Sequence, residues 1–160
     1  MKTYIFSILC ENEPGVMMRI SRIYMRRQVN IDSITVGMEP SGLARIILMF
    51  KTDSKMAKYL YQVIMRLNQV IEVEQLDEST SIVREIALIK TKPLSQAEQA
   101  ETLHEIERVG GRVLQIAGKS IIAELHGHHA RIERIIQNLG SKKLKEVARS
   151  GQVFISRSEK

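Results

Sequence analysis

The chain has no tryptophan, a single cysteine and few aromatic residues. Aromatic side chains make up 4% of its 160 residues, so the base stacking that single-stranded nucleic acid requires is poorly supplied. The one cysteine, Cys10, excludes an intrachain disulfide and fits a reducing compartment. No apolar run approaches the ~18 residues that a membrane span needs, and the N-terminus has no signal-peptide pattern. We therefore expect a cytoplasmic protein without a membrane anchor.

The charge pattern argues against a nucleic-acid partner. The formal net charge is +6, but Lys and Arg are interleaved with Asp and Glu along most of the chain. The densest basic runs, Arg26-Arg27 and Lys142-Lys143-Leu144-Lys145, fit solvated helix ends and loops. A basic surface without a DNA-binding motif indicates only non-specific attraction. An acidic protein partner is equally compatible with this charge.

Hydrophobic periodicity predicts the order strand, helix, strand, strand, helix, strand in the first half. Hydrophobic residues at 44% and charged residues at 26% are typical of a globular protein, so the chain has enough apolar side chains to bury a core. The pattern predicts strands at 2–10, 29–38, 46–50 and 70–76, and helices at 16–27 and 56–67.

The same order begins again after a polar bridge at 77–81. Ser95 is a predicted helix cap, and Gly110-Gly111 ends that helix. The pattern predicts strands at 83–92, 113–116, 120–125 and 144–154, and a second helix at 132–139 that ends at Gly140. We therefore expect two domains, 1–78 and 82–160.

The repeat predicts an α+β protein made of two ferredoxin-like (βαββαβ) domains. Each would have a four-stranded antiparallel sheet with two helices on one face. Such a sheet leaves its other face and its edge strands open, which favours pairing with a second copy. We expect a homodimer or a higher homo-oligomer.

The segment between the first strand and the first helix is the best candidate for a binding loop. Pro14 has the fixed φ that suits the first turn of a helix, and Gly15 allows a ligand to approach the backbone. The amides at a helix N-terminus favour a carboxylate or a phosphate. Asn12 adds a neutral donor and acceptor, a combination that suits a zwitterion such as an amino acid. The alternative is that Asn12 only caps the helix.

Four segments carry a resemblance to a known family: Glu11-Asn12-Glu13-Pro14-Gly15, Asn30-Ile31-Asp32-Ser33-Ile34-Thr35-Val36, Val83-Arg84-Glu85-Ile86-Ala87-Leu88-Ile89-Lys90 and Glu146-Val147-Ala148-Arg149-Ser150-Gly151. The βαββαβ order, together with Asn12-Glu13-Pro14-Gly15-Val16 and residues 27–36, resembles an ACT domain, the small-molecule regulatory module of amino-acid metabolism. All four together resemble the regulatory (small) subunit of acetolactate synthase, also called acetohydroxyacid synthase. The resemblance covers nearly the whole chain and is strongest in its first half.

The resemblance implies a non-catalytic subunit that binds and activates the catalytic large subunit and makes it sensitive to a branched-chain amino acid, usually valine. Leucine and isoleucine are the other candidates. Thiamine diphosphate, FAD and magnesium would belong to the large subunit. In the family the effector lies between two N-terminal ACT domains. Carried onto this chain, its contacts are Asn12, Pro14, Gly15, Val16 and Met17 from one copy, and Asn30 and Ile31 from the other.

The chain departs from the resembled family at two positions. Met18 stands where valine-sensitive relatives commonly have serine, and Gln28 replaces a glycine after the paired arginines. Without glycine, the end of that helix must either adopt a left-handed conformation at some cost or leave the helix differently.

Other features of the sequence give little support to a metal-binding or catalytic protein. His126-Gly127-His128-His129 lacks the spacing and partners of a zinc site, so we expect no metal site. Glu11 and Glu13 have no nearby His or Lys to complete an acid–base pair. An acylphosphatase-like hydrolase would carry an arginine within its phosphate loop, whereas Arg19 falls a turn into the helix. A free-standing ACT-type amino-acid sensor for another enzyme remains the alternative function.

Overall fold

The computed structural model describes residues 1–157, which form two compact units. Unit 1 consists of Met1–Ile82 together with the described residues from Phe154 onward, and unit 2 is Val83–Val153. Their strands and helices follow the order βαββαβ twice, and each unit has a four-stranded sheet. The predicted α+β fold of two ferredoxin-like domains is confirmed.

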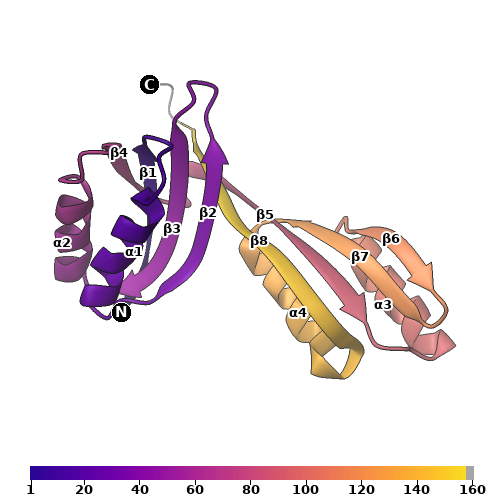
Figure 1. The fold of residues 1–160 in the computed structure, drawn as a ribbon. Coiled ribbons are helices and arrows are strands. Elements are labelled where there is room, and N and C mark those ends of the chain that lie inside the picture. Colours follow the sequence, from indigo (N-terminus) through magenta and orange to yellow (C-terminus); the bar gives the residue numbers. More distant parts are fainter. Residues whose placement is uncertain (158–160) are drawn as a thin grey trace. The chain divides into compact units, whose positions relative to one another are not determined.

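Unit 1 has a sheet with its first strand near the centre. Its elements are β1 (Lys2–Cys10), α1 (Val16–Arg26), β2 (Ile31–Met38), β3 (Ala44–Thr52), α2 (Ser54–Ile64) and β4 (Val70–Leu76). The strand order is β2-β3-β1-β4, and β1 pairs antiparallel with β3 and β4. Strands β2 and β4 are therefore the edges. Helices α1 and α2 lie side by side on one face of this sheet (Figure 1).

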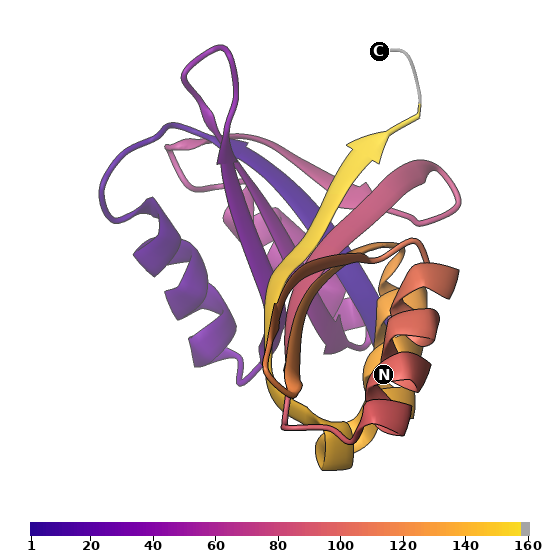
Figure 2. The ribbon, with the colours of Figure 1, turned by 90° about the vertical axis from the view of Figure 1, so that its right-hand side faces the viewer.

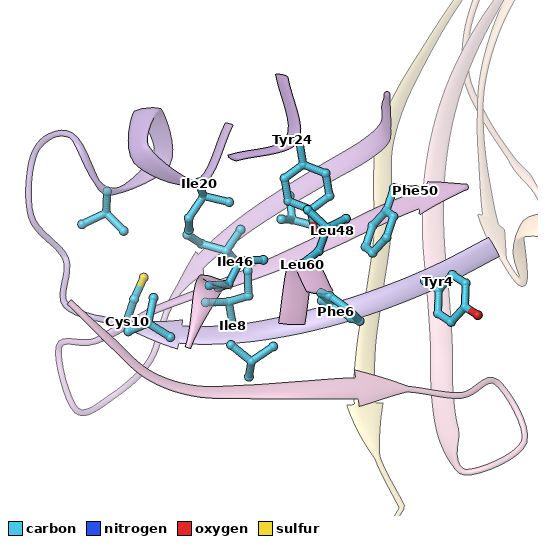
Figure 3. Packing of buried hydrophobic residues seen from close by; sticks show 14 of the residues in the cluster. Tyr4, Phe6, Ile8, Cys10, Ile20, Tyr24, Ile46, Leu48, Phe50 and Leu60 are labelled. Atoms are coloured by element: carbon cyan, nitrogen blue, oxygen red, sulfur yellow. The ribbon is translucent and has the colours of Figure 1, made fainter. Parts of the chain in front are cut away.

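The core of unit 1 lies between that sheet and its two helices. Helix α1 buries residues spaced four apart, Val16, Ile20 and Tyr24, which form one stripe along a 3.6-residue helix. Figure 3 shows Ile20 and Tyr24 pointing from α1 toward side chains of the sheet such as Ile46 and Leu48. This apolar stripe orients α1 and therefore fixes where its N-terminus lies.

Unit 2 repeats the arrangement with longer helices. It contains α3 (Gln96–Arg108), β6 (Arg112–Ala117), β7 (Ser120–Gly127) and α4 (His129–Lys143), and most of β5 (Ser81–Thr91) and β8 (Leu144–Ser156). The strand order is β6-β7-β5-β8. Figure 2 shows α3 and α4 together on one face of this sheet. Strands β5 and β8 each extend into unit 1 at one end.

The predicted helix cap at Ser95 is confirmed, whereas two other predicted element ends differ from the structure. The Ser95 hydroxyl accepts from the Glu98 amide and the Glu98 carboxylate accepts from the Ser95 amide, which is a complete capping box. Gly140 leaves the helical conformation, with φ 59° and ψ 178°, although one more turn follows it within α4. The second strand begins at Ile31 rather than at Val29, because the Val29 amide still donates to the carbonyl of Tyr24 and closes the end of α1.

Candidate functional site

The loop from Glu11 to Gly15 leaves the end of β1 and enters α1 through a left-handed residue. Gly15 is the N-cap, with φ 92°, a conformation that glycine adopts at little cost. A Cβ atom placed on Gly15 would find nothing within 4 Å, so the space in front of the loop is open. Pro14 precedes the cap, and so lies outside the first helical turn where we had expected it. The loop thus presents backbone to open space.

The N-terminus of α1 supplies unpaired amides to that space. The first full helical hydrogen bond runs from the Arg19 amide to the Gly15 carbonyl at 3.0 Å. The amides of Met17 and Met18 precede it and have no carbonyl acceptor within the helix. No acidic side chain lies in the first turn to neutralise the partial positive charge there. This end of α1 is therefore suited to a ligand carboxylate.

Two predicted contacts can offer little more than their backbone. The Val16 side chain is buried in the core of unit 1, and the Met17 side chain packs partly against it. A ligand in front of Gly15 would meet the main chain of both residues. By contrast, Met18 is 57% exposed and lies beside the free amides. Met18, one of the two positions at which the chain departs from the resembled family, is thus exposed at the N-terminus of α1.

Asn12 does not cap α1, so the alternative interpretation of that residue is wrong. The cap is Gly15, and no side chain accepts a hydrogen bond at this helix end. Instead, the Asn12 amide nitrogen lies 3.2 Å from the sulfur of Met38, the last residue of β2. A thioether is a weak acceptor, so the Asn12 side chain keeps most of its hydrogen-bonding capacity.

Asn30 and Ile31 stand at the start of β2, after the end of α1. Gln28 adopts φ 55°, the left-handed conformation that we expected as one of two outcomes where glycine is missing. This turn directs Asn30 into the strand, where its amide nitrogen lies 3.3 Å from the Asp32 carboxylate. Asn30 is exposed, and Ile31 packs partly against the core.

The register of the sheet places the two groups of predicted contacts at opposite ends of β2. Cys10 and Met38 both pair with Ala44, so the loop that follows Cys10 leaves the sheet level with the end of β2. Ile31 pairs with Phe50, near the other end of β3. Because β2 has eight residues, roughly 23 Å separates its two ends. A single chain does not bring Asn12 and Ile31 together.

The edge position of β2 leaves this strand open along its whole length. It pairs with β3 on one side only, as the strand order shows. Its exposed apolar side chains include Ile34 at 40%, Val36 at 53% and Met38 at 72%. A long apolar edge of this kind is a surface on which another strand can pair.

The loop has no catalytic side-chain pair. All four histidines of the chain lie between residues 104 and 129, outside unit 1. Arg19 lies within α1, one turn beyond the Gly15 cap. The arrangement can bind an anion and hydrogen-bond a polar ligand, but it places no general base beside a nucleophile.

Unit 2 holds an ionic cluster that sequence reasoning missed. The Glu85 side chain is 2% exposed, and its carboxylate accepts from Arg149 Nε at 2.5 Å and from Arg149 Nη2 at 3.1 Å. His129 Nδ1 lies 2.8 Å from the same carboxylate, and Arg149 Nη1 lies 2.7 Å from Glu133. Glu85 and Arg149 belong to the two family-like segments of the second half, which was the only signal in the sequence.

The cluster shifts the pKa values of its members. Burial acts to raise the pKa of Glu85, but the hydrogen bonds from Arg149 and His129 outweigh it and the pKa lies below its ordinary value. The hydrogen bond from Arg149 lowers the pKa of Glu133 as well. Both carboxylates are therefore charged at neutral pH, and Arg149 is the cation between them.

The histidines near the start of α4 have separate local partners. His128 Nδ1 accepts from the Ala130 amide at 3.3 Å and caps α4. His126 Nδ1 lies 3.9 Å from the Glu124 carboxylate, and His129 belongs to the ionic cluster. Each of these side chains thus contacts a different protein group.

Within residues 1–157, none of the helices combines the length and the apolar character needed to cross a membrane.

Comparisons with known proteins agree in both halves of the chain. The family described as "Small subunit of acetolactate synthase" matches residues 84–158, and the "AHAS small subunit-like ACT domain" matches residues 6–73. The probable acetolactate synthase small subunit of Archaeoglobus fulgidus is 33% identical over 158 residues, covering 96% of each chain. That of Methanothermobacter thermautotrophicus is 29% identical over 99% of this chain and 95% of its own. The crystal structure of the acetolactate synthase small subunit from Thermotoga maritima is 31% identical, covers 99% of both chains and superimposes with a TM-score of 0.88.

Proposed function

Because this chain belongs to the acetolactate synthase small subunit family, we propose that it is a non-catalytic regulatory subunit that activates the catalytic subunit and makes it responsive to a branched-chain amino acid. Valine is our first candidate, with leucine and isoleucine as the others. Thiamine diphosphate, FAD and magnesium are assigned to the catalytic subunit. Among residues 1–157, no group of three His, Cys, Asp or Glu side chains comes together to hold a metal. The buried free thiol of Cys10 fits the reducing cytoplasm.

The proposed effector site is supported by one observation: its two groups of predicted contact residues lie at opposite ends of β2. If the β2 edges of two copies pair antiparallel, the end of one strand lies beside the start of the other. Asn12 and Gly15 of one copy then approach Asn30 and Ile31 of the second copy. A two-fold axis repeats the arrangement, so a homodimer has two equivalent sites. The open apolar edge of β2 supports this pairing.

The chemistry of the paired site suits an α-amino acid. The ligand carboxylate would accept hydrogen bonds from the free amides beyond Gly15, where the helix carries partial positive charge. The ammonium group would donate to backbone carbonyls and to the side-chain oxygen of Asn12 or Asn30. The aliphatic side chain would pack against Ile31 of the second copy. Met18 would border the pocket and set how large that side chain can be.

Titration calorimetry with valine, leucine and isoleucine tests the site. We expect saturable binding of at least one of them to the wild type, and loss of binding in Asn12→Ala. The sharper pair is Gly15→Asp against Gly15→Asn, which match in size and in backbone strain at φ 92°. Only Gly15→Asp places a negative charge where the ligand carboxylate belongs. Equal binding by these two variants would refute the site.

The partnership with the catalytic subunit needs a separate assay. We expect the purified chain to raise the activity of the catalytic subunit, and the bound amino acid to lower it. Activation without any effect of the three amino acids, repeated with both subunits present, would overturn the effector assignment while keeping the partnership. Binding of an amino acid without any effect on the catalytic subunit would favour a free-standing ACT-type sensor.

A further inference from the structure

The chain crosses between its two units inside two neighbouring strands. The crossings fall between Ile82 and Val83, within β5, and between Val153 and Phe154, within β8. Strands β5 and β8 are adjacent in the sheet of unit 2. A contact that fixes the register of β5 against β8 therefore acts on both crossings.

Strand β8 is irregular close to its crossing. Gly151 adopts φ 77°, which is outside the extended conformation. Next to it, the Ser150 hydroxyl accepts from the Ile86 amide of β5 at 3.1 Å, so a side chain enters the hydrogen-bond ladder. The same hydroxyl donates to the Gly151 carbonyl at 2.7 Å. Interruptions of this kind weaken the specification of strand register by the backbone alone.

The ionic cluster supplies a second restraint at the same place. Arg149 precedes the irregular residues and binds both carboxylate oxygens of Glu85, one residue before Ile86. A bidentate guanidinium–carboxylate pair fixes direction as well as distance. The carboxylate is 2% exposed, so water competes little for it. His129 and Glu133 add contacts from α4 and hold both members in place.

We propose that the Glu85–Arg149 pair is a register pin that couples the two units through β5 and β8. Beyond the irregularity, Gln152 and Phe154 are buried, whereas Val153 and Ile155 are exposed. A slip of one residue would exchange these two sets, because neighbouring side chains of a strand point to opposite faces. The pin in unit 2, together with the backbone hydrogen bond from the Arg157 amide to the Thr80 carbonyl at 3.0 Å, therefore sets the register in which Phe154, and not its neighbours, is buried. The coupling is a property of the chain itself, and its use in passing effector binding from unit 1 to unit 2 rests on the proposed function.

The decisive variant is the double substitution Glu85→Leu with Arg149→Met. Replacing a buried ion pair by apolar side chains of similar volume commonly keeps stability, but it removes the directional bond. Hydrogen exchange measured by mass spectrometry on the full chain reports the opening of each unit separately. In the wild type we expect the slowest amides of both units to open together. In the double variant we expect the two units to differ by roughly tenfold or more in opening equilibrium.

A matched control is the ion pair between Lys143 and Glu101, at 2.5 Å, which joins α4 to α3 in the same unit. Lys143→Gln removes an ion pair of unit 2 without touching β5 or β8, so both units should still open together. If the double variant does not fold, Glu85→Gln keeps the shape of the side chain and removes its charge. That variant should show the same separation of the two units to a smaller extent.

Two results would overturn the pin. One is a wild type whose units already open independently, and the other is a double variant whose units open together as in the wild type. Neither depends on the regulatory proposal. Where an amino acid binds, the double variant should bind it with unchanged affinity, while protection of unit 2 on binding is lost. Normal transmission to unit 2 in that variant would be a third result against the pin, and this one rests on the proposed function.

Discussion

The two units share a topology but fill it with different chemistry. The core of unit 1 contains Phe6, Tyr24 and Phe50 in edge-to-face contact, with ring centroids 4.9 Å apart for Phe6–Phe50 and 5.0 Å for Tyr24–Phe50. The core cluster of unit 2 contains aliphatic side chains such as Ile106, and its sheet buries the Glu85 carboxylate beside Arg149. The same fold thus packs aromatic rings in unit 1, whereas unit 2 packs aliphatic side chains and also buries an ion pair.

The first helices of the two units also differ in how their N-termini are capped. Helix α1 begins at Gly15 with no side-chain cap and no acidic residue in its first turn. Helix α3 begins with the Ser95–Glu98 capping box, which satisfies its free amides and places a carboxylate there. The N-terminal amides of α1 are thus open to a ligand, whereas those of α3 meet side chains of their own helix. This difference favours unit 1 as the place of the proposed effector site.

The largest loss of stability should follow the removal of an aromatic ring from the core of unit 1. Phe50→Ala removes a ring that contacts Tyr4, Phe6 and Tyr24 and should destabilise unit 1 by about 3–5 kcal/mol. Urea unfolding followed by hydrogen exchange would measure this loss in unit 1. The matched substitution Ile106→Ala in unit 2 removes a smaller side chain and should cost less, about 2–4 kcal/mol. An equal or greater loss for Ile106→Ala would mean that the rings are not the main support of unit 1.

The next largest loss of stability should follow the removal of the ion pair in unit 2. Arg149→Ala leaves the buried Glu85 carboxylate without its guanidinium partner and with His129 as its remaining side-chain contact in the cluster, and should destabilise unit 2 by about 3 kcal/mol at neutral pH. The pKa of Glu85 is lowered in the folded protein, so its stabilisation is present above its ordinary pKa and is lost as the pH falls through the folded value. The cost of Arg149→Ala should therefore shrink in acid. A cost that stayed constant from pH 7 to low pH would show that lost packing, rather than lost charge, is responsible.

These contrasts also mark what the sequence could predict. Elements with strong local patterns were predictable, since the strand at 70–76 and the cap at Ser95 depend on neighbours a few residues away. The Glu85–Arg149 pair joins residues 64 apart, and no local pattern of the sequence predicts it. The Asn12–Met38 contact spans 26 residues and stands in place of the helix cap that was the alternative interpretation of Asn12. Local periodicity gave the fold, whereas side-chain partners depend on which strands become neighbours.

The N-termini of α1 and α3 provide a matched test of an uncapped helix against a capped one. Ser95→Ala removes the cap of α3 and should cost about 1 kcal/mol. Asn12→Ala should leave stability nearly unchanged, because Asn12 does not cap α1. The same substitution should abolish amino-acid binding in the calorimeter. A loss of stability in Asn12→Ala comparable to that in Ser95→Ala would return Asn12 to a structural role and weaken its place in the site.

The smallest effect concerns the ends of these first helices, where unit 2 uses glycine and unit 1 does not. Gly110 ends α3 with φ 67°, and Gln28 follows α1 with φ 55°. A left-handed conformation costs a residue with a side chain about 1–2 kcal/mol, whereas glycine adopts it freely. Glycine also makes the unfolded chain more flexible, which offsets part of the gain.

Gln28→Gly should therefore stabilise unit 1 by roughly 0.5 kcal/mol, measured as a higher urea midpoint with an unchanged slope. Gln28→Ala is the control, because alanine keeps the strain and should give no gain. The relief should leave amino-acid binding intact, since Asn30 already enters β2 through a left-handed turn. If Gln28→Gly instead changed the affinity for the amino acid, the strain at Gln28 would be part of how this chain positions Asn30, and its departure from the family would be functional rather than tolerated.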